Sequence, residues 1–351
     1  MRMEKIIDLI EPANQTAMKL ARNAQNNFIK PQGSLGVLED IAVKFAGITG
    51  KLHNSINNKI IFLFGSDHGI YDEGVSSAPQ SFTRGLMNIY SSTQDAAINI
   101  LTRQNGIDLK LLDLGIKKLG ILTRGVDFSH KHLDNGTANF LKFKAMKIYT
   151  TRNFINDGID LIEEYIRHDY NLFGMGEVGM GNTTPATACI MAVLKEYDPA
   201  LVGRGAGLSD EALEIKRDVI KRGLEKHWKD FDKDPVYIPA CVGGPEIAAM
   251  VGIFLGCAYF NVPAIVDGIT SIAAALVACE INPNVRDYIF LSNRSTEPAF
   301  SAAAEKLGLT PPLELNMRLG EGTGCAVMMP LIEDALAIMN NMRSFKNNGN
   351  L

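Results

Sequence analysis

The stretch Lys59-Ile60-Ile61-Phe62-Leu63-Phe64, followed directly by Gly65-Ser66-Asp67-His68-Gly69, decides the fold of this 351-residue chain. A continuous apolar run of this length is typical of a strand that is buried on both faces of a parallel sheet. Polar residues at the carboxyl end of such a strand belong to the functional edge of an open α/β sheet. We therefore expect chemistry near Ser66, Asp67 and His68.

Further strand-like runs follow this stretch, and helical patterns lie between most of them. The runs are Leu109–Leu114, Ala145–Tyr149, Leu172–Met175, Val262–Val266 and Tyr288–Leu291. This alternation predicts an α/β protein with a parallel, doubly wound sheet and right-handed crossovers. Before the first strand, residues 4–28 show the apolar spacing of an amphipathic helix.

Composition and charge exclude several classes of protein. A hydrophobic content of 46% allows a sizeable core, in one large domain or two. A net charge of −4 leaves no basic footprint, so nucleic acid is not expected as a partner. The five cysteines are odd in number and far apart, which predicts small core residues in a reducing compartment rather than disulfides. The N-terminal residues carry charges where a signal peptide is apolar, so we predict a cytoplasmic protein.

One segment is long and apolar enough to raise the question of a membrane span. Residues Ile247 to Val266 contain no charge, but Asn261-Val262-Pro263 interrupts them. Because proline breaks a helix, we predict a core helix over 245–260 and a short buried strand over 262–266. No membrane association is expected.

The glycine-rich stretch Met317–Gly324 is the first candidate for chemistry. Its three glycines alternate with other residues and let the backbone approach a ligand, and the apolar spacing of residues 325–341 predicts a helix directly after it. The single carboxylate within it, Glu321, is a candidate general base. The alternative is that Glu321 only complements the dipole of the helix N-terminus.

Two more glycine-rich stretches, Gly174–Pro185 and Val202–Glu211, combine exposed backbone with hydroxyl, amide and cationic groups. These are the groups that a phosphate and a ribose need. Neither stretch is a P-loop, and no acidic residue stands where a dinucleotide site requires one. Ser209 is predicted to cap a helix that carries Lys216, which either points into the protein or is a solvated surface lysine.

A set of motifs spread along most of the chain resembles the motifs of the nicotinate-nucleotide:dimethylbenzimidazole phosphoribosyltransferases and follows the same order as in that family. They are Lys30–Glu39, Asp67–Gly69, Glu73–Ser76, Gly176–Pro185, Val202–Gly205, Glu246–Met250, Val266–Gly268, Asn282–Asp287 and Met317–Gly324. The resemblance implies a Rossmann-like, mostly parallel six-stranded sheet with a small helical domain from the chain ends, in a dimer. The expected division is residues 1–55 plus about 331–351 for the helical domain and 56–330 for the catalytic domain.

The resemblance also implies the substrates and the role of each site residue. Nicotinate mononucleotide would transfer its phosphoribosyl group to an aromatic base, with Glu321 taking the proton of the base and Glu177 binding the ribose or orienting the nucleotide. The implied nucleotide and phosphate site comprises Gly176, Gly179, Asn182, Thr183, Gly203, Arg204, Gly205, Lys216, Ser295, Thr296 and Gly320. The implied acceptor pocket comprises Ser77, Ala78, Gly85, Met317 and Leu319. No cofactor or metal is required, and His130 and His132 are expected in a polar loop.

Departures from the family pattern fall in the acceptor pocket. Ala78 and Gly85 stand where the family usually has Tyr and Gln, and Asn316 stands where a Gly is usual. Two alternatives stay open. One is a weakly active or non-catalytic partner subunit in a heterodimer with a paralogue, instead of a homodimer. The other is a nucleotide-binding oxidoreductase, which only the glycine-rich loops on an α/β pattern suggest. The strand end Ser292–Glu297 lacks the usual His.

Overall fold

A computed structural model describes residues 2–117, 125–127 and 129–345. Its centre is a six-stranded sheet of order β3-β2-β1-β4-β5-β6, in which every pair of neighbouring strands is parallel. The strands are β1 (Asn58–Ser66), β2 (Asp108–Gly115), β3 (Val126–Asp127), β4 (Tyr170–Val178), β5 (Ala264–Val266) and β6 (Ile289–Leu291). This confirms the predicted α/β, doubly wound architecture, with the strand order reversing between β1 and β4.

One predicted strand is wrong and one strand was missed. Ala145–Tyr149 is not a strand: the backbone nitrogens of Ala145 and Met146 donate to the carbonyl oxygens of Cys241 and Ala240 (2.9 and 2.8 Å), and helix α6 (Ile148–Arg167) begins directly afterwards. A short apolar run at the start of a buried helix has the same pattern as a strand. β3 has only two residues, which is too short to produce a pattern.

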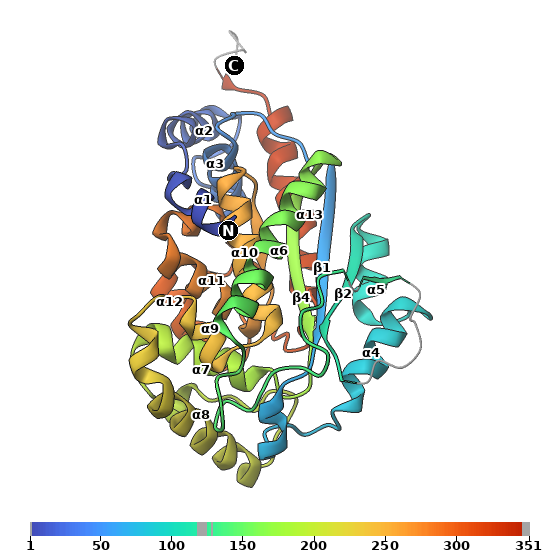
Figure 1. The fold of residues 1–351 in the computed structure, drawn as a ribbon. Helices are drawn as coiled ribbons and strands as arrows, with labels where there is room; N and C mark the ends of the chain where they lie inside the picture. The colour runs from blue at the N-terminus through green and yellow to red at the C-terminus, as the bar shows by residue number, and fades with distance from the viewer. Residues whose placement is uncertain (1, 118–124, 128, 346–351) are drawn as a thin grey trace.

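Helices cover both faces of the sheet (Figure 1). Phe62 of β1 stacks on Phe173 of β4 with ring centroids 6.3 Å apart, and it meets Tyr165 of α6 edge-on at 5.1 Å. Gly174, the next residue in β4, faces the opposite side, where a Cβ would lie 2.8 Å from the side chain of Cys325 in α13 (Thr323–Asn341). Because successive strand residues point to opposite faces, α6 and α13 lie on opposite faces of the sheet.

Helix α10 (Pro245–Tyr259) crosses α6 at unusually short range. A Cβ on Gly158 of α6 would lie 2.1 Å from the carbonyl oxygen of Ala249, and a Cβ on Gly252 of α10 would lie 1.9 Å from that of Ile155. Glycine is therefore required on both helices at this crossing. The charge-free segment 247–266 thus forms α10 and β5 as predicted, and no described helix is long and apolar enough to span a membrane.

Residues 15–49 and the C-terminal part of α13 lie side by side at one end of the sheet (Figure 1). The predicted helix over 4–28 is interrupted: α1 (Met3–Ile6) gives way to a 3₁₀ turn at Ile7–Leu9, and α2 (Gln15–Asn27) starts only after Asn14. Pro12 and the Asn14 side chain, which accepts from the Ala17 nitrogen at 2.9 Å, explain the break. The division into a helical and a catalytic domain stays a prediction.

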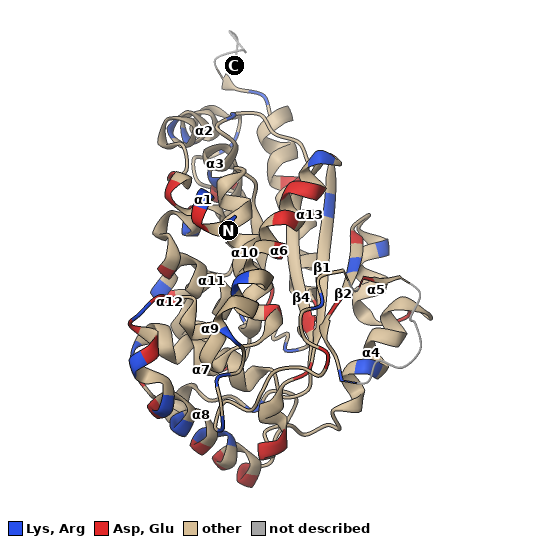
Figure 2. Ribbon diagram, viewed as in Figure 1, with Lys and Arg blue, Asp and Glu red and all other residues tan. Residues whose placement is uncertain are grey.

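The remaining elements connect the strands. The helices are α3 (Val37–Thr49), α4 (Ser81–Ser91), α5 (Ala97–Gln104), α7 (Thr183–Leu194), α8 (Asp210–Phe231), α9 (Tyr237–Val242), α11 (Ile269–Ile281) and α12 (Pro298–Leu307). Short 3₁₀ helices occupy Gly69–Glu73, Pro199–Leu201 and Pro283–Tyr288. Figure 2 shows residues of both charges along α8. All five cysteines are free, and all except the half-buried Cys279 are buried, as their positions in apolar runs predicted.

Candidate active site

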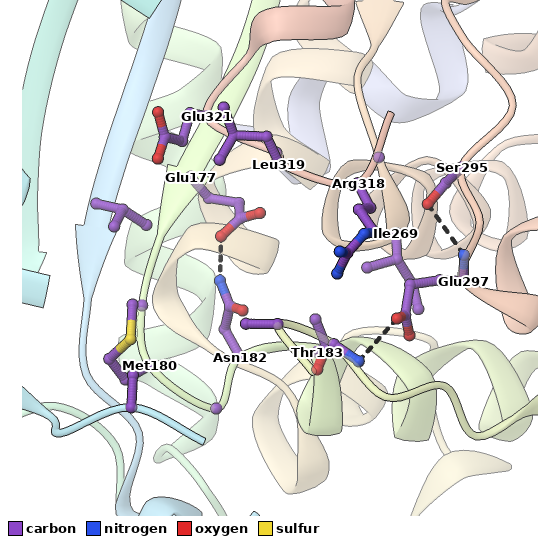
Figure 3. A pocket seen from close by; sticks show the side chains of 18 of the residues that line it. Glu177, Met180, Asn182, Thr183, Ile269, Ser295, Glu297, Arg318, Leu319 and Glu321 are labelled. Carbon is purple, nitrogen blue, oxygen red and sulfur yellow. Dashed lines mark hydrogen bonds between the residues drawn. The ribbon is translucent and has the colours of Figure 1, made fainter. Parts of the chain in front are cut away.

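A cavity of about 300 Å³ opens at the carboxyl ends of the strands, beside the point where the strand order reverses. This is the place where open α/β sheets bind their ligands. Among the predicted site residues, it is lined by Ser77, Ala78, Glu177, Gly179, Asn182, Thr183, Arg204, Gly205, Ser295, Met317, Leu319, Gly320 and Glu321. Figure 3 shows Glu177 and Asn182 opposite Ser295 and Glu297 across the cavity.

Glu321 has a backbone conformation that glutamate rarely adopts. Its φ is 62°, in the left-handed region, and it stands between Gly320 (φ 79°) and Gly322 (φ 81°) immediately before α13. Its side chain is only 8% exposed. A residue placed merely to complement the helix dipole needs no such strain, and strained residues cluster at functional sites. The geometry therefore favours the functional interpretation of Glu321 over the dipole interpretation.

Asp267, which sequence analysis did not select as a site residue, holds the loop that carries Glu321. It follows β5, and its two carboxylate oxygens accept from the backbone nitrogens of Gly322 (3.0 Å) and Gly324 (2.7 Å). Burial raises the pKa of Asp267 to about 6, although these backbone hydrogen bonds oppose the shift. Its position after a buried strand, at the same edge as Asp67, was the signal that would have found it.

Glu177 extends from β4 toward the same loop. Its carboxylate accepts a hydrogen bond from the Asn182 amide, and a Cβ on Gly320 would lie 3.0 Å from its Oε1. Burial, followed by the nearby carboxylates of Glu246 and Asp267, raises the pKa of Glu177 to about 8. Burial also raises the pKa of Glu321. The deep side of the cavity is thus a cluster of carboxyl groups, which favours a cationic ligand or transition state.

A buried ion pair lies beneath this cluster. Glu246 of α10 accepts from the Ser66 hydroxyl at 2.6 Å, and its Oε1 lies 3.2 Å from Nε2 of His68. Burial alone would lower the pKa of His68, but Glu246 outweighs it and raises the pKa, while the pKa of Glu246 is lowered. A Cβ on Gly179 would lie 2.4 Å from the Ser66 carbonyl oxygen, so this glycine is needed for close packing.

Lys216 is not a surface lysine. Its side chain is completely buried, and its ammonium donates to Thr183 Oγ1 (2.8 Å) and to the Gly203 carbonyl oxygen (2.9 Å). Burial lowers its pKa to about 8, although Glu297 opposes the shift. Glu297, a second residue that sequence analysis missed, accepts from the Gly205 nitrogen at 2.8 Å. Lys216, the Thr183 hydroxyl and the Gly205 nitrogen are donors suited to an anion at the start of α7, and the Glu297 carboxylate accepts from the Gly205 nitrogen in this structure.

Some predicted residues support the cavity without lining it. Gly176 and Gly203 allow close packing, since Cβ atoms there would lie 2.3 Å from the Glu321–Gly322 peptide and 2.1 Å from Glu297 Oε2. Thr296 and Gly85 are exposed outside the cavity, and Lys216 lies behind Thr183. The unusual Asn316 has φ 54°, a left-handed conformation that asparagine tolerates.

His130 and His132 both approach one carboxylate. Their ring nitrogens lie 3.5 and 2.6 Å from Asp157 Oδ2, away from the cavity lining. Within the described part of the chain, only His227, Asp230 and Cys241 bring three ligand-type atoms within 4.8 Å of one another. The ammonium of Lys144 lies 3.5 Å from the Cys241 sulfur and is paired with Asp230, so a cation already occupies that cluster.

A doubly wound sheet with a carboxylate cluster, a buried lysine and a glycine-rich loop at the strand ends is typical of an α/β enzyme. Residues 10–349 match the phosphoribosyltransferase family. The chain is 37% identical to the nicotinate-nucleotide–dimethylbenzimidazole phosphoribosyltransferase of Clostridium perfringens (strain ATCC 13124), covering 98% of this chain and 94% of that protein. It is 39% identical to the Geobacter sulfurreducens enzyme of the same name, covering 99% and 97%.

A solved structure gives the same result. The crystal structure of CobT from Thermus thermophilus has a TM-score of 0.89 and 32% identity, covering 95% of this chain and 98% of that one. The chain therefore belongs to the nicotinate-nucleotide–dimethylbenzimidazole phosphoribosyltransferase family and is a phosphoribosyltransferase. This membership replaces the oxidoreductase alternative, and nothing in these relatives favours a non-catalytic subunit.

Proposed function

We propose that this chain transfers the phosphoribosyl group of nicotinate mononucleotide to an aromatic base, releasing nicotinate and forming an α-ribotide for cobamide synthesis. The observation that carries the proposal is the strained, buried Glu321 beside Glu177 in the cavity at the strand ends. The names of the relatives, which specify this donor and dimethylbenzimidazole as acceptor, support it.

The chemistry requires one base and no general acid. The pyridinium ring of nicotinate mononucleotide is already cationic, so nicotinate leaves C1′ with the bonding electron pair and needs no proton. An azole attacks C1′ from the opposite face through one nitrogen and loses the proton on its other nitrogen to Glu321. The bond from C1′ to nicotinate breaks as the bond to the azole forms, which inverts the β-nucleotide to an α-product. Those carboxyl groups of the cluster that are ionised stabilise positive charge at C1′.

The phosphate is proposed to bind at the other side of the cavity. The nitrogen of Gly205, the Thr183 hydroxyl and the Ser295 hydroxyl lie there, with Lys216 behind Thr183. A phosphate dianion would supply the counter-charge that no described residue gives the buried ammonium at hydrogen-bonding distance. Glu177 and Asn182, placed between the phosphate site and Glu321, are suited to bind the ribose hydroxyls.

The acceptor pocket is proposed to be apolar and wide. Phe82, Leu86 and Met180 line it, and Ala78 contributes only a methyl group. An apolar pocket discriminates among ligands by about 1–3 kcal/mol per methylene, far less than a pocket that requires a hydrogen bond. We therefore propose that the acceptor range extends from dimethylbenzimidazole to benzimidazole, purines such as adenine, or phenols.

The partner of the chain also stays a proposal. A homodimer is expected from the family resemblance, and a heterodimer with a paralogue would reshape an acceptor pocket that lacks Tyr and Gln. The direct test is to incubate the purified chain with nicotinate mononucleotide and a panel of azoles, purines and phenols. Acceptor-dependent release of nicotinate supports the proposal, and no release with any acceptor contradicts it for the chain alone.

A further inference from the structure

Tyr90 buries a hydroxyl in the shell behind the carboxyl cluster. It lies on α4, which packs against β1, β2 and β4, and its side chain is 1% exposed. Among the described residues, its hydroxyl has no hydrogen-bond partner of ordinary geometry. A phenylalanine would fill the same space without burying an unsatisfied polar group. The hydroxyl therefore calls for a partner that this form of the site does not fully engage.

The groups that face this hydroxyl identify the partner. Burial raises the pKa of Tyr90, and so do the charge of the Glu321 carboxylate and a weak hydrogen bond to it that falls short of ordinary geometry, with a smaller contribution from Glu177. Tyr90 thus keeps its proton at neutral pH and can donate it in a hydrogen bond. Three titratable side chains surround Glu321 itself: Tyr90 from α4, Glu177 from β4 and Asp267 after β5. The other two are acids, so Tyr90 is the natural donor.

We propose that Tyr90 is a positioning residue, whose hydroxyl donates to the Glu321 carboxylate a hydrogen bond that is long in the empty site and tightens when the acceptor base fills it. The bond would occupy one carboxylate oxygen and leave the other to take the proton of the acceptor. The same helix carries Phe82 and Leu86, which line the cavity, so acceptor binding and the placement of Tyr90 are linked through α4. Hydrogen bonds of catalytic groups are often long in empty sites and tighten in the substrate complex.

This inference rests on the proposed function for its kinetic consequences, but it also makes a claim about the protein without substrates. The Tyr90 hydroxyl stabilises the ionised form of Glu321, so it lowers a pKa that burial raises. Removal of the hydroxyl should therefore raise the pKa of Glu321. The acid limb of the pH profile, which reports ionisation of the base, should move to higher pH.

The first experiment is a ¹³C NMR titration of carboxyl-labelled glutamate in wild type and Tyr90→Phe. The Glu321 signal is assigned by its loss in Glu321→Gln. We expect its midpoint to rise by about 0.5–1 pH unit in Tyr90→Phe. Tyr288→Phe is the matched control, because it also removes a buried tyrosine hydroxyl, bonded to the Glu11 carbonyl oxygen at 2.9 Å and to Asn261 Oδ1 at 3.1 Å. An equal midpoint in Tyr90→Phe and wild type would overturn the inference.

The second experiment is kinetic. At pH values on the acid limb, Tyr90→Phe should lower kcat about three- to tenfold, and at higher pH it should lower kcat less. The KM for nicotinate mononucleotide should stay unchanged. Tyr288→Phe should keep the wild-type pH profile. In a Glu321→Gln background the Tyr90→Phe change should have no further effect, because it acts through Glu321. Additive losses would contradict the inference.

The two proposals fail in distinguishable ways. If the wild-type chain never releases nicotinate, the proposed function is contradicted. The NMR titration still tests the role of Tyr90 in that case. If Tyr90→Phe does not fold, 3-fluorotyrosine placed at position 90 supplies the test. It is a stronger donor of nearly the same size, so it should lower the midpoint of Glu321, and an unmoved midpoint would overturn the inference.

Discussion

The carboxylate of Asp267 accepts a 2.7 Å hydrogen bond from the backbone nitrogen of Gly324, and this contact holds the loop that carries Glu321. The other carboxylate oxygen of Asp267 accepts from the backbone nitrogen of Gly322, so one side chain fixes both glycines. Asp267→Asn leaves a single acceptor oxygen and should loosen the loop. We expect kcat to fall roughly tenfold to a hundredfold, since small misplacements of a reacting group cost this much, with little change in the KM of nicotinate mononucleotide.

The control for Asp267→Asn is Asp287→Asn, which removes a comparable carboxylate bond to a backbone nitrogen, that of Ala13, at 3.0 Å. It should leave kcat unchanged. Equal effects of the two substitutions on kcat would show that Asp267 acts only on overall stability.

Glu177 should make the folded protein less stable as the pH rises. Its folded pKa of about 8 lies above the ordinary value of 4.5, so the native state binds the proton more tightly than the unfolded state does. The resulting stabilisation is present below pH 4.5 and is lost as the pH rises through 8. Glu177→Gln should therefore gain stability relative to wild type between pH 5 and 8, by roughly 3–4 kcal/mol, measured by denaturant unfolding.

Glu163→Gln provides a control of opposite sign for this measurement. Hydrogen bonding to Arg2 lowers the pKa of Glu163, so that carboxylate stabilises the native state above its unfolded pKa, and its removal should cost more at pH 7 than at pH 4. A Glu177→Gln protein with the same relative stability at pH 5 and pH 8 would show that Glu177 titrates normally.

Lys216 should act on the phosphate alone. Lys216→Ala should weaken nicotinate mononucleotide by about 1.5–3 kcal/mol, the range for a lost charged hydrogen bond, and should leave nicotinate riboside nearly unaffected. Isothermal titration calorimetry with both ligands measures the difference. Lys221→Ala, which removes an exposed lysine of the same helix, should change neither affinity. If both ligands weaken equally in Lys216→Ala, the lysine supports the fold and not the phosphate.

Acceptor selectivity should depend on Ala78, which lines the cavity, and on Gly85, which lies outside it but directly precedes the lining residue Leu86 on α4. A side chain at Gly85 meets nothing within 4 Å, so Gln fits there without strain, and Tyr at Ala78 would narrow the cavity. Ala78→Tyr with Gly85→Gln should sharpen turnover toward dimethylbenzimidazole, whereas wild type should show a flatter range over the panel. A wild type that already prefers dimethylbenzimidazole a thousandfold, with no change in the double variant, would assign selectivity to other residues.

A feature of this structure can be predicted from the sequence when the residues that determine it lie close together in the chain. β1 and the loop at Glu321 are visible in the sequence because an apolar run and alternate glycines lie within a few residues. Ala145–Tyr149 was misread because a buried helix start and a buried strand share the same pattern. Asp267 and Tyr90 were missed because their partners lie far away in the sequence, and only the packed structure brings them together. The burial of Lys216 likewise depends on α7 and the Gly203 loop rather than on its own helix.

The central claim is that Glu321 takes the proton of the acceptor, and Glu321→Gln tests it most directly. The measurement is nicotinate release from nicotinate mononucleotide with saturating acceptor, together with the affinity for the nucleotide. We expect nearly unchanged nucleotide affinity and a turnover lowered by roughly a hundredfold to ten-thousandfold, the range for a positioned base. A Glu321→Gln protein that turns over at the wild-type rate would contradict the account.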